Sequence, residues 1–264
     1  MSTYTQNEHM PLISIIVAVR NGALTLQRCI NSITDQSYAL KELIIIDGKS
    51  TDGTVAIIET NSTVIKYWES EPDRGVYHAW NKALDHVKGD WICFLGADDF
   101  FWKANVLGQL AEYLKNAGPK TTCAYGRVAL VDENGKTLMT IGEPWEKIKK
   151  KFRQIMCLPH PGLMHHHSIF ERKGKFVENF RIAGDYELLL RELIHWDPVF
   201  IPITVVGMQN GGLSTKPNNV VISLKEMRFA QKMNGIKYPG AKWLSGFLAA
   251  NVKFLLSSYR QSES

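Results

Sequence analysis

The stretch Trp91-Ile92-Cys93-Phe94-Leu95-Gly96-Ala97-Asp98-Asp99 indicates both the fold and the place of a functional site. Its first five residues are apolar. Such a run is too short for a free-standing helix and is typical of a strand buried on both faces. The run ends in small residues and two adjacent carboxylates, whose oxygens suit Mg²⁺ or Mn²⁺. The alternative is a solvated acidic turn that caps a following helix, which we expect over residues 102–117.

Segments upstream repeat the pattern of a buried strand, a loop and a helix. The strands are expected at residues 13–19, 43–46 and 64–68, and a helix is expected at residues 76–87. Strands that alternate with helices predict βαβ units and a mainly parallel sheet covered on both faces. The expected fold class is therefore α/β.

Charged residues follow several of these strands. Arg20 follows the first strand, Asp47 ends the second, and Asp98 and Asp99 follow the fourth. Ligands of parallel sheets bind outside the carboxyl ends of the strands, so these residues predict a site at that edge. The first loop has neither a Gly-x-Gly-x-x-Gly pattern nor a Gly-Lys-Ser/Thr phosphate loop, which argues against dinucleotide dehydrogenases and P-loop NTPases. The acidic edge suits a nucleotide whose phosphates arrive with a metal.

Six motifs then occur in a fixed order, at residues 11–21, 47–54, 71–82, 97–99, 182–191 and 211–214. The first, second and fourth resemble family 2 glycosyltransferases of the GT-A fold. The other three resemble a subgroup that builds bacterial surface polysaccharides, including colanic-acid-type enzymes. The resemblance covers about residues 10–230. It implies a GT-A, Rossmann-like, mixed but mainly parallel sheet flanked by helices.

The resemblance also implies roles for single residues. Nucleotide contacts fall on Ala18, Arg20, Asp47, Asp73 and Asp98. Asp99 would hold the Mn²⁺ or Mg²⁺ that bridges the donor diphosphate, and Asp185 would be the general base. Contacts to the donor sugar or the acceptor are expected at His78, Asn81, His160, Gly211 and Gly212. The subgroup usually carries an acidic residue where this chain has His78.

The expected reaction moves a sugar from a nucleoside-diphosphate donor, a UDP-sugar by family habit, to a hydroxyl of a growing, lipid-linked polysaccharide. A divalent ion would neutralise the leaving diphosphate, and a carboxylate would take the proton of the acceptor hydroxyl. One base and a metal-assisted leaving group imply direct displacement with inversion. The alternative for Asp185 is that it only caps the helix containing Leu188-Leu189-Leu190.

A second hypothesis is a nucleotide-sugar-binding or nucleotidyltransferase-like protein on a related sheet. A nucleotidyltransferase would normally carry a Gly-rich, basic loop after the first strand to hold the triphosphate. Here that loop offers only Arg20-Asn21-Gly22, which argues against it.

The middle of the chain leaves several alternatives open. Residues 122–131 and 136–141 are expected to form a hairpin. The basic helix at residues 145–154 is either a solvated face or a surface for anionic lipid or a phosphate-bearing acceptor. His165-His166-His167 is expected in packing rather than in a zinc site, because only alternate residues of a strand share a face. Gly211-Gly212 is either a closing loop or a turn.

The expected organisation is a polar arm at residues 1–10, a GT-A domain at 11–218 and C-terminal helices at 219–264. The first of these helices is expected at residues 220–234. The apolar stretch after it is too interrupted to span a bilayer, which takes about 20 continuous apolar residues. It suits either an amphipathic helix in the membrane interface or packing on the domain or a second copy.

Composition sets the remaining expectations. With 264 residues, 45% of them hydrophobic, the chain suits one large domain. Its four cysteines show no paired spacing, and its first ten residues are polar, so we expect reduced thiols and a cytoplasmic protein. The sequence leaves two questions open: whether the protein contacts the inner face of the plasma membrane peripherally, and whether it forms an oligomer. The net charge of +5 comes with no nucleic-acid motif, so we expect no nucleic acid as a partner.

Overall fold

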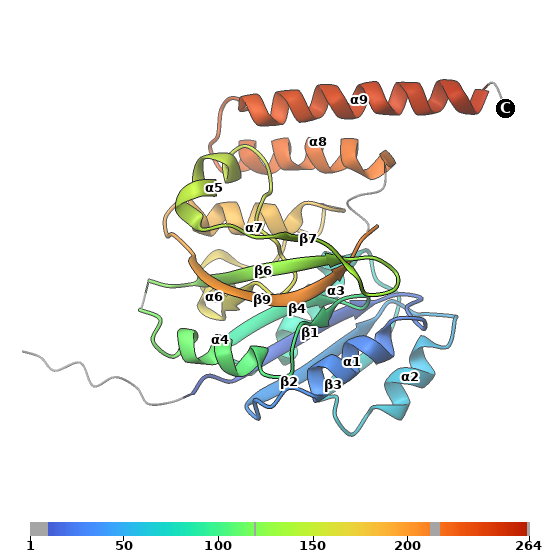
Figure 1. The fold of residues 1–264 in the computed structure, drawn as a ribbon, viewed down its shortest axis with the longest axis vertical. Helices are drawn as coiled ribbons and strands as arrows, with labels where there is room; N and C mark the ends of the chain where they lie inside the picture. Colours follow the sequence, from blue (N-terminus) through green and yellow to red (C-terminus); the bar gives the residue numbers. More distant parts are fainter. Residues whose placement is uncertain (1–9, 119, 212–216, 263–264) are drawn as a thin grey trace, which may run out of the picture.

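A mixed sheet with helices on both faces forms the body of the molecule (Figure 1). The computed structural model describes residues 10–118, 120–211 and 217–262, the last segment with its side chains from 219 to 252. The strands are β1 (Ile13–Val19), β2 (Lys41–Asp47), β3 (Tyr67–Ser70), β4 (Trp91–Gly96), β5 (Phe100–Phe101), β6 (Cys123–Val131), β7 (Thr137–Ile141), β8 (Met164–His166) and β9 (Val199–Gln209).

Helices connect most of these strands, as the alternating pattern predicts. They are α1 (Leu26–Thr34), α2 (Thr54–Thr60), α3 (Val76–Ala83), α4 (Val106–Leu114), α5 (Trp145–Phe152), α6 (Ser168–Lys173), α7 (Gly184–Leu193), α8 (Pro217–Met233) and α9 (Ala241–Ser262). A short 3₁₀ turn, Leu84–His86, follows α3.

The strand order in the sheet is β3-β2-β1-β4-β8-β6-β9-β5, with β7 paired to β6. The first four strands are parallel, and β6 and β9 are parallel to each other. Strand β8 lies between β4 and β6 and is antiparallel to both, so β6 and β9 run in the same direction as β4. The expectation of a mixed, mainly parallel α/β sheet is thus confirmed.

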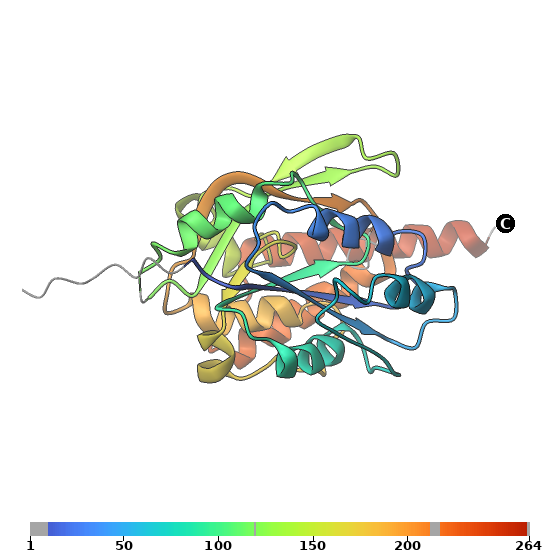
Figure 2. The ribbon, with the colours of Figure 1, turned by 90° about the horizontal axis from the view of Figure 1, so that it is seen from below.

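The core lies on both faces of this sheet. Ile13, Ile15 and Val17 of β1 pack under α1 and α4, whereas Ile16 of the same strand packs with α3 and α7 on the opposite face. Figure 2 shows α1 and α4 on one side of the sheet and α3 and α6 on the other. Burial on both faces explains why these strands read as continuous apolar runs.

Several predicted boundaries are wrong, and the reasons are tertiary. The third strand begins at Tyr67 and ends at Ser70, later than expected. The helix expected over residues 102–117 is only Val106–Leu114. Phe100 and Phe101, just before the expected start, pair with β9, and the Trp102 amide donates to the Val205 carbonyl at 2.9 Å instead of starting a helix. The helix expected over residues 76–87 also ends early, because α3 stops at Ala83.

The C-terminal helices lie in layers on the α7 side of the body (Figure 1). Helix α8 packs on α7 and α9 packs on α8, where the Trp243 indole donates to the Leu224 carbonyl at 2.7 Å. Within the described part of the chain, no helix is both long and apolar enough to cross a membrane. The division at residues 218 and 219 stays a prediction.

The hairpin expected around residues 132–135 is confirmed as β6 and β7. His165 is fully buried and packs on Phe94 and His160, whereas His167 pairs with Glu171 at 3.1 Å. The described residues contain no cluster of three or more His, Cys, Asp or Glu side chains suited to a metal.

Candidate active site

The carboxyl ends of β1 and β2 meet in a network around Asp47. This carboxylate is fully buried and accepts the Ser50 amide at 2.9 Å, the Ser50 hydroxyl and the Ser70 hydroxyl at 2.6 Å. Asn21 links the two loops: its amide donates to the Ser50 hydroxyl at 2.7 Å, and its side chain accepts the Thr51 amide at 2.9 Å. Asp47 is thus held in a preformed cradle of loop residues.

Asp73 and Arg20 lie against the same cradle. A Cβ on Gly48 would collide with the Asp73 carboxylate and would lie 3.4 Å from the Cβ of Arg20. The absence of a side chain at Gly48 therefore allows both residues to approach the end of β2. The Asp73 carboxylate also accepts the Gly75 amide at 2.9 Å, just before α3 begins. Two sequence motifs far apart in the chain thus converge on one loop.

Ala18 lies between this cradle and the acidic pair. In the sheet register it is aligned with Ile46 of β2 on one side and with Gly96 of β4 on the other. The strand ends that carry Asp47 and Asp98 are thus separated by a single strand. The five residues expected to contact the nucleotide all fall along this edge of the sheet.

Asp98 and Asp99 converge over Gly96. A Cβ on Gly96 would lie 2.7 Å from Oδ1 of Asp98 and 2.7 Å from Oδ2 of Asp99. Asp99 is buried, and its carboxylate accepts the Gly96 amide at 3.2 Å and the Gln209 amide at 3.3 Å. Burial, together with the neighbouring Asp98 charge, raises the pKa of Asp99 to about 7.

These two carboxylates fit a divalent cation. Adjacent acidic oxygens in a site where burial penalises their charge gain from a hard cation such as Mg²⁺ or Mn²⁺. Such ions are commonly bound by one or two carboxylates, with substrate phosphates and water as the other ligands. The bare Cα of Gly96 leaves room for the two carboxylates to come together.

Arg28 of α1 holds this acidic turn from behind. Its guanidinium donates to the Asp98 carbonyl at 2.7 Å and to Oε1 of Gln209 at 3.1 Å, and it lies 4.8 Å from the Phe100 ring centroid. Sequence reasoning missed Arg28. No local motif marks it, since the contact requires β9 to return beside β5.

Asp185 lies in the first turn of α7 and is half-buried. Its Oδ1 accepts the Tyr186 amide at 2.7 Å and the Tyr77 hydroxyl at 3.3 Å. A helix N-terminus and these donors lower the pKa of a carboxyl, but burial outweighs them and raises the pKa of Asp185 to about 6. A carboxylate with a pKa near 6 is a better proton acceptor than an exposed aspartate.

Tyr77 joins the two motifs. It is buried in α3, and a Cβ on Gly184 would lie 2.8 to 2.9 Å from its ring atoms. Asp185 is therefore carried next to α3, the helix that begins two residues after Arg74 and the nucleotide-side loop.

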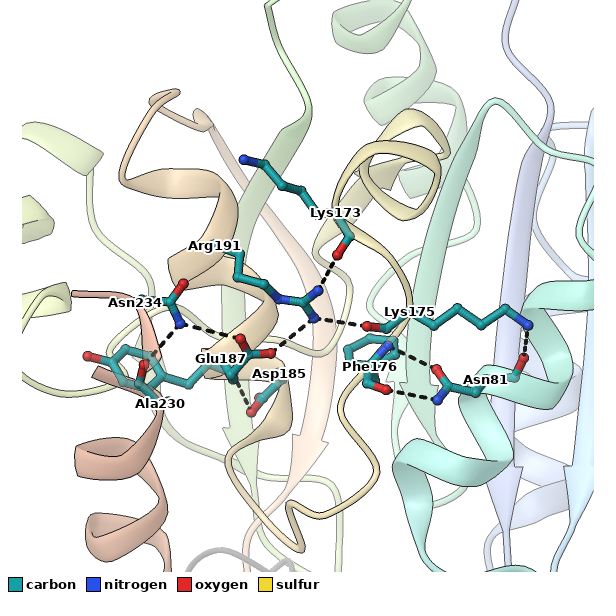
Figure 3. Close-up of polar contacts among 10 residues, drawn as sticks. Asn81, Lys173, Lys175, Phe176, Asp185, Glu187, Arg191, Ala230 and Asn234 are labelled. Carbon is teal, nitrogen blue, oxygen red and sulfur yellow. Dashed lines mark hydrogen bonds and ion pairs between the residues drawn. The ribbon is translucent and has the colours of Figure 1, made fainter. Parts of the chain in front are cut away.

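A strap at residues 173–178 ties α3 to α7 (Figure 3). The Asn81 amide group donates to the Phe176 carbonyl at 2.9 Å and accepts the Phe176 amide at 3.0 Å. The Arg191 guanidinium donates to the carbonyls of Lys173 and Lys175 and pairs with Glu187 at 3.0 Å. Asn81 is thus part of the scaffold that holds α7, and its contact with a sugar stays a prediction.

The other predicted contact residues in the described part of the chain make no hydrogen bond to the Asp47, Asp73, Asp99 or Asp185 carboxylates. His160 is buried, stacks on Trp80 with ring centroids 5.3 Å apart, and has its pKa lowered to about 3 by burial. His78 accepts the Arg74 amide at 3.3 Å. Gly211 follows β9 with φ of 99°, and Gly212 lies outside the described residues.

Comparison with known proteins agrees with this geometry. The model of the family described as glycosyl transferase family 2 matches residues 14–178. A PGL/p-HBAD biosynthesis glycosyltransferase from Mycobacterium bovis is 30% identical over 216 residues, covering 81% of this chain and 76% of that protein. A glycosyltransferase from Mycobacterium tuberculosis is 31% identical over 224 residues, covering 82% of this chain and 83% of that protein.

Solved structures show the same fold at low identity. A mannosyltransferase from Pyrobaculum calidifontis, in complex with GDP-Man and Mn²⁺, gives a TM-score of 0.65 at 18% identity, covering 92% of this chain and 70% of that one. TarS of S. aureus, residues 1-349 in complex with UDP-GlcNAc, gives 0.64 at 15% identity, covering 92% and 73%. The sheet is thus a GT-A sheet. The likeness to the colanic-acid-type subgroup stays a prediction.

The family assignment favours a sugar transferase over a nucleotidyltransferase-like protein. Asp185 lies beyond the matched residues, so its role rests on the motif and its geometry. With a matching family model over more than half of its length and relatives at this level of identity, the chain belongs to glycosyltransferase family 2.

Proposed function

We propose that this glycosyltransferase is metal-dependent and inverting, and that it transfers a sugar from a UDP-sugar to a hydroxyl of a lipid-linked glycan. The observation that carries the proposal is the convergence of Asp47 and Asp73 with Asp98 and Asp99 along one edge of the sheet. Asp185 contacts Tyr77 of α3, the helix that begins directly after the Asp73 loop.

The nucleotide would bind over the ends of β1 and β2. Carboxylate oxygens of Asp47 and Asp73 suit the donor groups of a base, and Arg20 and Ala18 border the same space. Asp47 is fully buried under Ser50 and Ser70, so a base would contact it in place of one of these hydroxyl groups. The Asp47 carboxylate accepts hydrogen bonds from the Ser50 amide and from the Ser50 and Ser70 hydroxyls, so the carboxylate is oriented before the ligand arrives. Preorganisation of this kind lowers the entropic cost of binding.

Asp99, with Asp98 beside it, would hold the divalent ion. When bound, that ion supplies Lewis-acid neutralisation of the charge that grows on the leaving diphosphate. Arg28 holds the main chain of Asp98 and the side chain of Gln209, and so fixes the turn that presents both carboxylates.

Asp185 would accept the proton of the attacking hydroxyl. Burial raises the pKa of Asp185 to about 6, so the carboxylate is more basic than an exposed aspartate but is still mostly ionised at neutral pH, and Tyr77 contacts one of its oxygens. A positioned base of this kind contributes roughly 10²–10⁴-fold to rate. Direct attack with one base would invert the configuration at the anomeric carbon.

The names of similar proteins support a nucleotide sugar as the donor and a lipid-linked glycan as the acceptor. The mannosyltransferase was solved with GDP-Man and Mn²⁺, and TarS with UDP-GlcNAc, so both belong to proteins that bind a nucleotide sugar. The mycobacterial relative acts in PGL/p-HBAD biosynthesis by name. We favour uridine among the bases and a lipid-linked acceptor.

Peripheral attachment to a membrane is part of this proposal. Leu244, Leu248 and Val252 of α9 are exposed and lie four residues apart on one face of the helix. Replacement of Leu244 and Leu248 by Glu would release the protein from membranes on fractionation. Glu at the exposed Leu138 and Met139 of β7 is the matched control. Unchanged membrane binding of the α9 variant would exclude the attachment.

Calorimetric titration with UDP, with and without Mn²⁺, tests the nucleotide site directly. We expect binding that requires the metal in the wild type and is lost in Asp99→Ala, whereas Glu133→Ala, at an exposed hairpin position, binds as the wild type does. If UDP does not bind under any condition, GDP and dTDP are tested next. Failure of all three would exclude the proposed site.

The catalytic role is tested separately. Asp185→Asn is expected to bind nucleotide normally but to lower transfer by roughly 10²–10⁴-fold. Transfer at a near wild-type rate would exclude the role of base. The anomeric configuration of the product, read by NMR, tests inversion.

A further inference from the structure

A carboxylate on α8 binds the segment that leads into Asp185. Glu226 accepts three consecutive main-chain N–H groups, from Arg181 at 2.9 Å, Ile182 at 2.8 Å and Ala183 at 2.8 Å. These bonds cross more than 40 residues of sequence. Hydrogen bonds from several main-chain donors to one ionised acceptor are short and roughly twice as strong as neutral ones.

The peptide groups at Ile182 are held from both sides. The Ile182 amide donates to Glu226 of α8, while its carbonyl accepts the Tyr77 hydroxyl of α3 at 2.6 Å. The same hydroxyl lies 3.3 Å from Oδ1 of Asp185, which is the weaker of the two acceptors that share its single proton. The chain just before Asp185 is therefore clamped between two helices, and Gly184 makes close contact with the Tyr77 ring.

Glu226 is suited to this position by sequence as well. It is the only acidic residue of α8, whose neighbouring charged residues Lys225, Arg228 and Lys232 are basic. Arg228 donates to the carbonyls of Ile236 and Lys237 rather than to Glu226. The Glu226 charge is thus directed to the 181–183 segment.

We propose, resting on the role of Asp185 as base, that Glu226 is a positioning residue: it fixes residues 181–183 so that Asp185 meets the acceptor hydroxyl in a productive geometry. The C-terminal helix α8 is then a working part of the active site. A base displaced by about 1 Å can lose roughly 10²-fold in rate, so a clamp on the adjoining segment matters for turnover.

Charge gives a second readout. Burial is the main cause of the raised pKa of Asp185, and the Glu226 charge adds to it, while the Tyr77 hydroxyl and the Tyr186 amide lower it. The titratable groups that bear on Asp185 from neighbouring helices are thus Tyr77 on α3 and Glu226 on α8. Removing the Glu226 charge should lower the pKa of Asp185.

The test compares Glu226→Gln with Glu226→Asp and a matched control, Asn234→Ala. Asn234, directly after α8, donates to Glu187 of α7 at 3.3 Å (Figure 3). In the described part of the chain, its other side-chain hydrogen bond goes to the Ala230 carbonyl, so its partners lie outside residues 181–183. Four quantities are measured: amide hydrogen exchange at residues 181–183, the pKa of the Asp185 carboxyl by NMR, and, where turnover is found, kcat and donor KM. The first two require no knowledge of the donor.

For Glu226→Gln we expect at least tenfold faster exchange at residues 181–183, a lower pKa of Asp185, and kcat reduced by about 10–10²-fold with donor KM within about twofold. The acidic limb of the kcat profile should move to lower pH, because the base ionises more readily. Asn234→Ala should change none of these. Glu226→Asp keeps the charge, so the pKa of Asp185 should stay near wild type while exchange rises.

Unchanged exchange and an unchanged Asp185 pKa in Glu226→Gln would overturn the inference, as would equal effects in Asn234→Ala. If Glu226→Gln does not fold, a kcat of Glu226→Asp no lower than that of Asn234→Ala overturns it instead. The proposed function fails differently. If Asp185→Asn keeps wild-type transfer, both claims fall. If Asp185→Asn loses transfer and Glu226→Gln transfers at the wild-type rate, only the positioning role falls.

Discussion

Substitution of Gly184 by Ala tests the close contact that sets Asp185 against α3. A Cβ at this position would lie 2.8 to 2.9 Å from three atoms of the Tyr77 ring, closer than real Cβ contacts. The ring has little freedom to retreat, because Tyr77 is 3% exposed, its hydroxyl is bonded to the Ile182 carbonyl, and Phe176 stacks on it at 5.6 Å. Either α7 or α3 must therefore shift.

The cost of that shift can be bounded. Adding one carbon to a well-packed site typically costs about 1–3 kcal/mol. A gain in helix propensity offsets little of it, because Gly184 is the first residue of α7. We therefore expect Gly184→Ala to lower the free energy of unfolding by about 1–3 kcal/mol and, by displacing Asp185, to lower kcat by about 10²-fold.

Gly108 offers a matched control. It lies inside α4, and a Cβ there would have no atom within 4 Å. Gly108→Ala should raise stability by about 0.5–1 kcal/mol, since glycine is a poor helix former. Urea unfolding measures both variants, with a constant m-value as evidence that the unfolded states are comparable. A Gly184→Ala protein as stable and as active as the wild type would refute the packing argument.

Three further predictions concern residues around the site. Asn81→Ala should lower the free energy of unfolding by about 1–3 kcal/mol in urea, because the buried Phe176 amide and carbonyl lose their partner. The control Asn116→Ala, at an exposed position, should change it by less than about 0.5 kcal/mol. Equal effects of the two substitutions would contradict the role of the strap. Arg28→Ala should weaken Mn²⁺-dependent UDP binding about tenfold in calorimetry, because the Asp98 turn loses its charged donor. Unchanged affinity would show that the turn keeps its conformation without Arg28. Asp185→Asn should be more stable than the wild type at pH 8 by about 1–3 kcal/mol. The folded pKa of about 6 lies above the ordinary 3.8, so ionisation of Asp185 weakens the fold as pH rises between those values; the advantage should shrink in urea unfolding at pH 5, and no advantage at pH 8 would refute the buried-charge argument.

The sequence determined the parallel part of the sheet and its acidic edge. Ile13–Val19 and the stretch ending at Asp98 and Asp99 are buried strands because a run with no polar face can only lie between two layers. Asp47 and Asp98 then fall at strand ends separated only by β1, because parallel strands place their carboxyl ends on one side. Local pattern and chain direction are enough for this, and the family motifs agree.

The element boundaries near residue 100 and the second half of the sheet were decided by pairing between strands that are distant in the sequence. Phe100 and Phe101 lie next to a helical pattern, yet they form β5 because β9 offers them a partner. Strand β8 is three residues long, too short to show a period, and takes its place only between β4 and β6. Such contacts join segments far apart in sequence, so no local window contains them.

Only the tertiary structure decided how the acidic residues are supported. Asp73 reaches the Asp47 cradle through the gap at Gly48, and Asp185 reaches α3 through the close contact of Gly184 with Tyr77. Arg28 and Glu226 belong to helices whose sequences carry no motif, yet each holds a loop that bears a predicted site residue. The sequence specifies which groups can do chemistry, because that depends on residue type. Their orientation depends on packing between distant segments, which exists only in the folded chain.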